Sequence, residues 1–477
     1  MKTPILGSSY VARSVNAAAN RCVNLFAEAV PEGGKEAAFF SRCPGLRLIT
    51  TIGTGPIRGL WQFGGFAYVA SGTTLYKVNS AWSASVIGTI TGTGQVSMAN
   101  SATQLWIACN PDAFVYTVDT GTFQQLADSI TNIFDGAGTV SYMDEFFLFN
   151  KPDTDEIYAS NNADGAVIPV GSFTQVTGTS DIIISVMANH RELWIFATNS
   201  IEVYYYSGGE FFPFDRIQGA FNEIGCAAAY SVAKLDNGLF WLGSDARGSG
   251  IVYRTNGYSG QRISTHAIEF AISGYSVISD AVAFTYQQEG HAFYVLTFPT
   301  EGKTWVFDIS TMAWHERASY VGGEFARHRA NCQMNFNNQA VVGDYENGKI
   351  YAYDLDVYTD DSQTQKWLRS WRALPPGQNN LKRSVQHSLQ LDCETGSGAQ
   401  VYSEPTVSLR WSDDGGHTWS NYHEKGIGLT GNYSKRVIWR RLGMTMKLRD
   451  RVYEISGTND QKVAIIGAEL IVDQTSS

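Results

Sequence analysis

The stretch from Arg191 to Ser207 is a hairpin of two short apolar strands joined by a Thr-Asn-Ser turn. In its first strand, Leu193 and Ile195 alternate with Trp194 and Phe196, so both faces carry apolar groups and both need cover. The second strand alternates more polar residues with apolar ones, as expected one step nearer the surface. A two-stranded hairpin is not stable alone, so this segment predicts a packed sheet with further strands.

The same hairpin recurs along the middle of the chain. Its copies start roughly 40 to 50 residues apart, the spacing of four-stranded propeller blades, which bury their faces against their neighbours. An additional strand pattern commonly precedes the hairpin and supplies the expected innermost strand. The predicted fold is mainly β, a β-propeller of about seven blades; six or eight remain open because no repeated dipeptide marks each blade. The copies are Phe66–Val78, Gln104–Val118, Phe146–Ser160, Arg191–Ser207, Leu239–Thr255, Ala292–Asp308 and Ala340–Asp354.

Length and composition agree with a repeat architecture. At 477 residues the chain exceeds the size at which one hydrophobic core usually stops growing. Only 17% of residues are charged and 47 are glycine, which suits short strands and turns better than long amphipathic helices. The six cysteines show no paired spacing, so we expect buried free thiols and neither a zinc knuckle nor a disulfide framework. They are Cys22, Cys43, Cys109, Cys226, Cys332 and Cys393.

Targeting signals and charge narrow the functional classes. The N-terminus lacks the apolar core of a signal peptide, and no run reaches the roughly 18 apolar residues of a membrane helix. We therefore expect a soluble product made in the cytoplasm. The formal net charge of -10 argues against a clamp on nucleic acid, which needs basic residues in register with phosphates. It is compatible with a channel along which DNA slides, because an acidic wall repels phosphate.

The pattern divides the chain into three parts: an N-terminal arm over residues 1–54, the propeller over residues 55–361, and a C-terminal β-sandwich or platform domain over residues 362–477. The arm has few periodic runs, yet leaving Phe39 and Phe40 in water is unfavourable, so part of it should pack on another domain or subunit. After residue 361 the composition changes and longer strands follow, which suits a small sandwich.

One motif in the last domain has a specific shape. Its sequence, S-x-D-x-G-x-T-W, matches the Asp box, a hairpin whose carboxylate holds the turn by accepting backbone hydrogens while the Trp packs beneath. Sialidases carry several such boxes, but their chemistry resides elsewhere. We therefore interpret this single copy, which lies outside the repeats, as a structural turn. Its residues are Ser412, Asp414, Gly416, Thr418 and Trp419.

Catalytic signatures are absent from the sequence. The eight histidines show no metal-ligand spacing, and no nucleophile elbow occurs. Glycoside hydrolysis would need two carboxylates converging across the propeller axis, and Asp245, Glu269 or Glu289 on blade loops could supply them. A sialidase-like propeller glycosidase acting on host surface polysaccharide is therefore the alternative function.

The strongest cationic cluster is the basic run between residues 435 and 451. Its charges alternate with apolar residues, which places charge on one face of a strand. In a protein of net charge -10, a rim that meets an acidic partner is a better interpretation than a nucleic-acid contact. We expect this run at the interface with neighbouring subunits or an adaptor. Its basic residues are Lys435, Arg436, Arg440, Arg441, Lys447, Arg449 and Arg451.

Several short motifs, in order along nearly the whole chain, carry a family resemblance. Together they resemble the packaged-DNA stabilisation protein, the tail hub or nozzle of short-tailed phages of the Salmonella podovirus type. The motifs are ANRCVNLFAEAVP (19–31), CPGLR (43–47), GPIRGLW (55–61), LYKV (75–78), GTGQVSMAN (92–100), ELWIFATNSIEVYYYSG (192–208) and YSKRVIWRRLG (433–443).

This resemblance implies a structural virion protein of the tail. It implies a six-fold homohexameric ring below the portal and adaptor that continues the DNA channel, retains packaged DNA with the help of a needle protein, and carries tail spikes or fibres. Double-stranded DNA would pass through the lumen without specific binding. The resemblance implies a protein without catalytic residues, metal or cofactor, and without membrane insertion.

Overall fold

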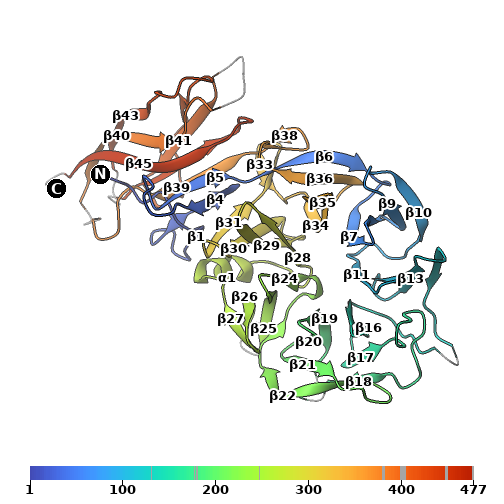
Figure 1. Cartoon of the computed structure of the whole chain (residues 1–477). Helices are drawn as coiled ribbons and strands as arrows, with labels where there is room; N and C mark the ends of the chain where they lie inside the picture. The colour runs from blue at the N-terminus through green and yellow to red at the C-terminus, as the bar shows by residue number, and fades with distance from the viewer. Residues whose placement is uncertain are drawn as a thin grey trace.

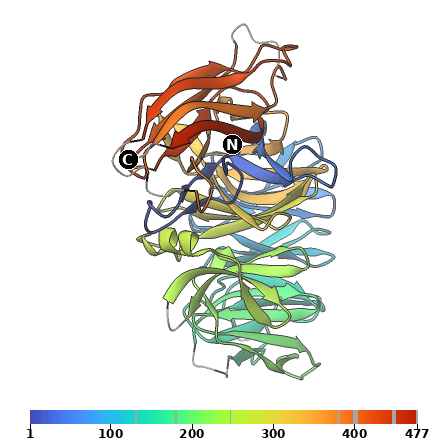
Figure 2. The same cartoon turned by 90° about the vertical axis from the view of Figure 1, so that its left-hand side faces the viewer.

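The computed structural model describes residues 1–129, 132–176, 178, 181–245, 248–378, 382–397, 404–445 and 450–474. Its chain forms a propeller with a sandwich attached to one side. In Figure 1 the blades follow one another around a ring, while the sandwich and both chain ends lie together at the upper left. Turning the view by 90° separates the two parts, with the sandwich above the propeller (Figure 2).

The described strands form a propeller of seven blades, and each blade has four principal strands. All seven predicted hairpins form the second and third strands of their blades, which confirms the propeller. Blades 1 to 3 consist of β7 (Ile57–Phe63), β8 (Phe66–Ser71), β9 (Thr74–Val78) and β10 (Ala84–Thr89); β11 (Ser97–Asn100), β12 (Gln104–Ala108), β13 (Ala113–Thr117) and β14 (Thr122–Gln125); and β15 (Val140–Met143), β16 (Phe146–Asn150), β17 (Glu156–Ala159) and β18 (Phe173–Gln175).

The remaining blades follow the same order, from the axis outward. Blades 4 and 5 consist of β19 (Ile183–Asn189), β20 (Glu192–Ala197), β21 (Ile201–Tyr206) and β22 (Phe214–Asn222); and β23 (Gly225–Cys226) with β24 (Ala233–Leu235), β25 (Gly238–Asp245), β26 (Gly248–Asn256) and β27 (Ser259–Arg262). Blades 6 and 7 consist of β28 (Val282–Gln288), β29 (His291–Phe298), β30 (Lys303–Asp308) and β31 (Ala313–Arg317); and β34 (Ala330–Phe336), β35 (Gln339–Asp344), β36 (Lys349–Asp354) and β6 (Gly45–Thr51).

Strand β6 closes the ring and belongs to the propeller, although the sequence pattern places residues 45–51 in the arm. It pairs antiparallel with β36, from Gly45 opposite Asp354 to Thr51 opposite Lys349. The alternation after residue 45 is visible in the sequence, but its partner lies about 300 residues away, beyond the reach of a local pattern. The first and last blade strands are thereby fastened by backbone hydrogen bonds.

The sandwich combines arm strands with C-terminal strands, as the pair of Phe39 and Phe40 suggests. Phe40 is buried and Phe39 is half-buried. One sheet has the order β4 (Leu25–Ala29), β5 (Ala38–Arg42), β45 (Ala464–Gln474), β40 (Ser384–Cys393) and β43 (Val437–Met444). The facing sheet consists of β3 (Cys22–Val23), β39 (Trp367–Arg372), β44 (Val452–Gly457), β41 (Thr406–Ser412) and β42 (His423–Gly426).

This second sheet is continuous with blade 6. Strand β3 pairs parallel with β31 through Val23 and Glu316, and antiparallel with β39 through Cys22 and Val23. The result is a nine-stranded sheet that runs from the propeller axis into the sandwich. Because the two domains share a sheet, their relative orientation is fixed by backbone hydrogen bonds.

Short elements complete the fold. A 3-10 turn and one α-helix occur among the described residues: η1 (Ala229–Ser231) and α1 (His266–Ser273). Three small hairpin pairs also occur among the described residues: β1 (Tyr10–Val11) with β2 (Ala19–Asn20), β32 (Ser319–Val321) with β33 (Glu324–Ala326), and β37 (Thr359–Asp360) with β38 (Gln363–Thr364). The last pair extends the sheet of blade 7, because β37 pairs parallel with β6. No helix in the described parts is long and apolar enough to cross a membrane.

Burial between blades holds the propeller together. Trp106 and Trp241 are fully buried, and Trp194 and Trp305 are nearly so. Each of these rings contributes roughly 3 kcal/mol or more on burial. Trp61 differs, because it is partly exposed at the propeller axis.

The closing strand provides a matched test, because Leu46 is 1% exposed and Leu48 on the same strand is 44% exposed. Leu46 packs among blade 6 and blade 7 side chains. We expect Leu46→Ala to lower the free energy of unfolding by about 2–5 kcal/mol and Leu48→Ala by less than about 1 kcal/mol. Urea or thermal unfolding of the two variants measures this difference, and equal effects would contradict the assignment of β6 to the core.

Candidate functional site

The Asp box forms a closed turn after β41. Asp414 accepts hydrogen bonds from the Thr418 backbone N–H at 2.9 Å and from the hydroxyls of Ser412 and Thr418 at 2.6 Å each. Ser412 Oγ also accepts from the Gly416 N–H at 2.8 Å. Trp419 Nε1 donates to the Gly416 carbonyl at 3.1 Å, which fixes the indole under the turn. Each of these bonds is internal to the hairpin, so the motif acts as a structural turn here.

Electrostatics in this turn favour the ionised acid. Hydrogen bonds from Ser412 and Thr418 hold the pKa of the Asp414 carboxyl well below its ordinary value. A carboxyl whose pKa is lowered on folding stabilises the fold at pH values above its unfolded pKa of about 3.9. That stabilisation is lost as the pH falls through the folded pKa.

We expect Asp414→Ala to lower the melting temperature at pH 7, since the Thr418 and Ser412 donors lose their acceptor. The gap between the variant and the wild type should begin to shrink as the pH falls below about 4, because the unfolded wild-type chain then takes up a proton that the folded turn accepts only at lower pH. Thermal unfolding followed from pH 7 to pH 3 measures this. A gap that stayed constant over that range would show that the carboxylate does not stabilise the turn.

The basic run does not form one cationic face. Arg451 is buried and forms a bidentate ion pair with Asp413, with N–O distances of 2.7 and 2.8 Å. Lys435 pairs with Glu404 at 2.8 Å, and Arg436 donates to the side chain of Gln390. These residues therefore serve the internal structure of the sandwich.

Two arginines of the run remain available to a partner. Arg440 and Arg441 are exposed on β43, which is the edge strand of its sheet, and neither has an ion pair among the described residues. They are adjacent and both exposed because the strand bulges there, with Arg441 at a φ of 60°. Lys447 and Arg449 lie outside the described residues.

This division can be measured with two variants of the same strand region. Arg451→Met should lower the free energy of unfolding by about 3–5 kcal/mol, because it leaves the carboxylate of Asp413 partly buried without its partner. Arg440→Met removes an exposed charge and should change that free energy by less than about 0.5 kcal/mol. Chemical denaturation of both variants checks the result; equal stability would contradict the structural role of Arg451.

Arginines of the arm and sandwich also bind the domains together. The buried Arg42 donates to the carbonyls of Tyr358 at 2.9 Å and Gln461 at 3.0 Å, so it joins the arm, the interdomain linker and the sandwich. Burial lowers its pKa to about 10, which still leaves the guanidinium charged at neutral pH. Arg21 holds Glu316 of blade 6 through two hydrogen bonds of 2.9 and 2.8 Å.

The propeller axis forms a pocket of about 470 Å³ lined by the innermost strands of the blades. One end is crossed by a bridge, because the Tyr230 hydroxyl of blade 5 donates to the Gln95 carbonyl of blade 2 at 3.0 Å across the axis. Asn331 reinforces this floor: its Nδ2 donates to Gln95 Oε1 at 3.0 Å, and its carbonyl accepts from Gln95 Nε2 at 3.2 Å. Lys234 is the one charged side chain among the described residues that line the pocket.

The acidic residues considered for hydrolysis are not brought together at this pocket. Glu269 lies on α1, where it pairs with Arg262 and accepts from the hydroxyl of Ser264. Glu289 occupies the turn between β28 and β29, and the side chain of Asp245 lies outside the described residues. Because neither Glu269 nor Glu289 lines the axial pocket, the structure does not support the paired carboxylates that a glycosidase requires.

The far side of the propeller carries exposed apolar side chains. Val170 and Phe173 of blade 3 and Tyr206 and Phe211 of blade 4 are all exposed, with Phe211 at 70%. We name these four residues the blade 3–4 aromatic surface. Large exposed apolar side chains gathered on neighbouring blades commonly mark an interaction site.

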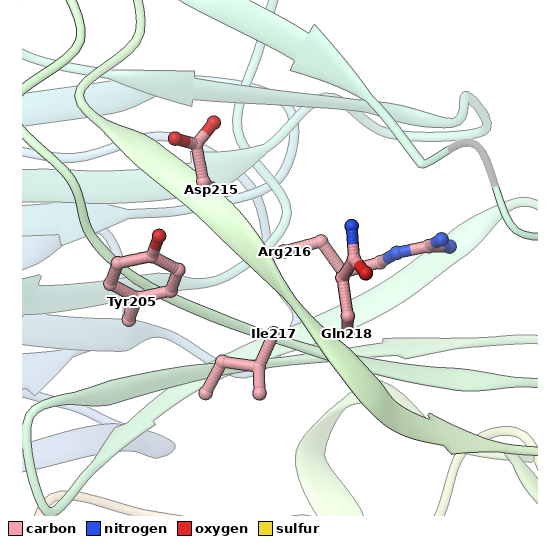
Figure 3. A pocket seen from close by; sticks show the side chains of 5 residues that line it. All are labelled: Tyr205, Asp215, Arg216, Ile217 and Gln218. Carbon is pink, nitrogen blue, oxygen red and sulfur yellow. The ribbon is translucent and has the colours of Figure 1, made fainter.

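A hollow of about 640 Å³ lies on the outer strand of blade 4. Its lining comes from Tyr205 and from consecutive residues of β22, Asp215 to Gln218. In Figure 3 the side chains of Arg216 and Gln218 are directed away from Tyr205. Arg216 is held by the buried Glu202 at 3.1 Å, so the hollow has no free cation at that position.

Sequence reasoning missed the axial pocket and the interdomain arginines. The floor of the pocket depends on Tyr230 and Gln95, which are 135 residues apart, and no local pattern connects them. Lys234 does leave a signal, since it is a single polar residue between the apolar Ala233 and Leu235 of an innermost strand. The residues that the structure describes hold no cluster of potential metal ligands.

Comparison with known proteins accounts for both domains. A family profile described as "Bacteriophage P22 Gp10, beta-propeller" matches residues 1–358, and one described as "Bacteriophage P22 Gp10, beta-sandwich" matches residues 367–473. This chain belongs to the bacteriophage P22 Gp10 family. It is therefore a structural protein of a phage tail and not an enzyme. The Gp10 propeller profile includes the arm, in agreement with the closing position of β6.

Solved structures similar to this Gp10-family chain share little sequence with it. A chain in the mitotic checkpoint complex is 13% identical, with a TM-score of 0.44 over 69% of this chain and 97% of that one. The extracellular domain of the one-component system BT4673 from B. thetaiotaomicron is 11% identical, with a TM-score of 0.43 over 88% of this chain and 58% of that one. PorZ from Porphyromonas gingivalis is 11% identical, with a TM-score of 0.39 over 79% of this chain and 46% of that one. No curated protein in the comparison matches the chain.

Proposed function

We propose that this protein is the tail hub, or nozzle, of a short-tailed phage, and that six copies form a ring that extends the DNA channel below the portal and adaptor. Its membership of the Gp10 family supports this role. The observation that carries the proposal is the closed propeller axis, crossed by the hydrogen bond between Tyr230 and Gln95. Duplex DNA, whose major groove alone is about 12 Å wide, cannot pass through such an axis. The DNA path must then lie between subunits.

A closed ring needs two different contact surfaces on each subunit, because each copy meets its neighbours head to tail. The exposed Arg440 and Arg441 on the edge strand β43 supply one charged surface on the sandwich. We assign this surface to a neighbouring subunit or to the adaptor. We assign the blade 3–4 aromatic surface, at the opposite end of the molecule, to a tail appendage such as a spike or fibre.

The charge balance suits a channel that must release its cargo. Tight phosphate contacts would retain DNA with a strongly salt-dependent affinity, whereas an acidic or neutral lumen lets it slide. In this chain 45 acidic residues outnumber 35 basic ones. The needle protein, which closes the lumen in this scheme, would retain the DNA without phosphate contacts from the ring.

We expect the double variant Arg440→Glu with Arg441→Glu to fold normally but fail to join tails, because the reversed charge repels the acidic partner surface. Lys425→Glu, on the neighbouring strand β42, serves as the control for a charge change elsewhere on the sandwich. Electron microscopy of particles assembled with each variant measures ring formation around the tail axis. Normal rings with the double variant would contradict the interface.

The same preparations separate an interface from a DNA clamp. At low salt the wild-type protein should bind duplex DNA no more tightly than about 10⁻⁴ M, the weak end of non-specific binding. Micromolar binding that disappears in the double variant while rings still form would make these arginines a DNA contact and overturn the proposal.

A further inference from the structure

We propose that the axial pocket of each propeller binds an acidic sugar residue, whose carboxylate sits against Lys234. This would be a binding site separate from the ring contacts, and it does not depend on the hub role. The pocket measures about 470 Å³, within the range of about 300–1,000 Å³ typical of small-molecule sites.

The pocket accepts a ligand from one side. Its floor is crossed by Tyr230 and Asn331, each of which is hydrogen-bonded to Gln95. Its mouth opens toward the turns that join the first and second strands of the blades, where a second hollow of about 390 Å³ shares Lys234 and Thr285 with it. A blind pocket takes the end or tip of a ligand and excludes a chain that continues in both directions.

Lys234 gives the pocket its charge preference. No aspartate or glutamate lines the pocket within the described ranges, although the protein as a whole is acidic. The Lys234 ammonium has no ion pair in the part of the chain that the structure describes, and burial alone lowers its pKa. The side chain is reachable by solvent and yet surrounded by protein, because it stands inside the pocket. An incompletely solvated, unpaired ammonium favours an anionic ligand.

The rest of the lining matches a sugar better than a peptide or a bare phosphate. The partly exposed rings of Trp61 and Tyr142 offer flat apolar faces, and Trp61 is held in place because its Nε1 donates to Asn100 Oδ1 at 2.9 Å. Asn100 and Gln333 add carboxamides. Asn100 Nδ2 donates to the Ser101 carbonyl and Gln333 Nε2 to Asn335 Oδ1, each at 2.9 Å, which leaves each amide a second hydrogen for a sugar hydroxyl. Aromatic rings can pack on the C–H faces of a sugar, and carboxamides can bond to its hydroxyls. Inorganic phosphate has no apolar face for the rings to contact.

Two hydroxyl groups of the lining already accept backbone hydrogen bonds. Ser97 Oγ accepts from the Val140 N–H, Thr139 Oγ1 accepts from the Val186 N–H, and each bond joins two neighbouring blades. A peptide end would bring additional amide groups that need such partners. With the carboxylates absent from the lining that the structure describes, the pocket has no acid and base pair for hydrolysis, so the proposed activity is binding only.

Calorimetric titration of the full-length protein at low salt and pH 7 tests the proposal with four probes: glucuronate, glucose, triglycine and inorganic phosphate. We expect saturable binding of glucuronate and at least tenfold weaker binding of glucose, because a charge-assisted hydrogen bond is lost. Triglycine or phosphate binding as tight as glucuronate binding would overturn the sugar assignment, and the absence of saturable glucuronate binding would overturn the site.

Two variants locate the site. Lys234→Met keeps most of the apolar stem of the side chain, and it should weaken glucuronate binding at least tenfold while leaving the weak binding of glucose unchanged. Lys425→Met, an exposed lysine on the sandwich, is the matched control and should bind as the wild type does. Unchanged affinity in Lys234→Met, with thermal unfolding showing that it is folded, would contradict the proposal. Equal losses in both variants would point to a general effect of charge and contradict it as well.

Discussion

The two-residue strand β3 is the contact on which the architecture depends. A propeller and a sandwich are each able to bury their own faces, and nothing in either fold fixes the angle between them. Here Val23 pairs with blade 6 on one side, and Cys22 and Val23 pair with the sandwich strand β39 on the other. The backbone groups of a buried strand must be satisfied, so moving one domain relative to the other would break hydrogen bonds inside the protein interior. Arg21 and Arg42, which flank this strand and its sheet, add charged donors to the same junction.

Through these pairings the first 51 residues hold the propeller and the sandwich together. Strand β6 closes the propeller, strands β4 and β5 extend a sandwich sheet, and β3, which precedes them in sequence, joins the two domains. A loose arm would leave the propeller open at blade 7 and the domains free to swing. For a ring component that must keep a channel aligned with its neighbours, a fixed angle between domains keeps the subunit interfaces in register.

Local pattern predicts the parts of this fold that are local. The seven hairpins are visible because period-two alternation and turn residues occur within 20 residues of one another. The partners of β3 and β6 are not visible, since a strand of two or seven residues carries no information about a neighbour 300 positions away. The basic run failed as a single surface for a related reason. Spacing along the chain indicates which face of the sheet Arg451 lies on. It does not reveal that Asp413 forms an ion pair with Arg451 there. The sequence shows Lys234 as a single charged residue in an apolar strand. It does not show that Lys234 lines a pocket, because one end of that pocket is formed by Tyr230, which lies outside the strand.

The position of the chain ends has a consequence for synthesis. The N-terminal amine donates to the carbonyl of Leu470 at 2.7 Å, and β5 needs β45, the last strand of the chain, as its neighbour. A ribosome delivers residues in order at about 5–20 per second, so the arm waits many seconds before its partner emerges. During that time the blades can form one after another. Strand β6 lacks its partner β36 until blade 7 has been made, and β5 lacks its partner β45. The sandwich sheet is therefore completed only after β45 has been synthesised, long after its neighbour β5.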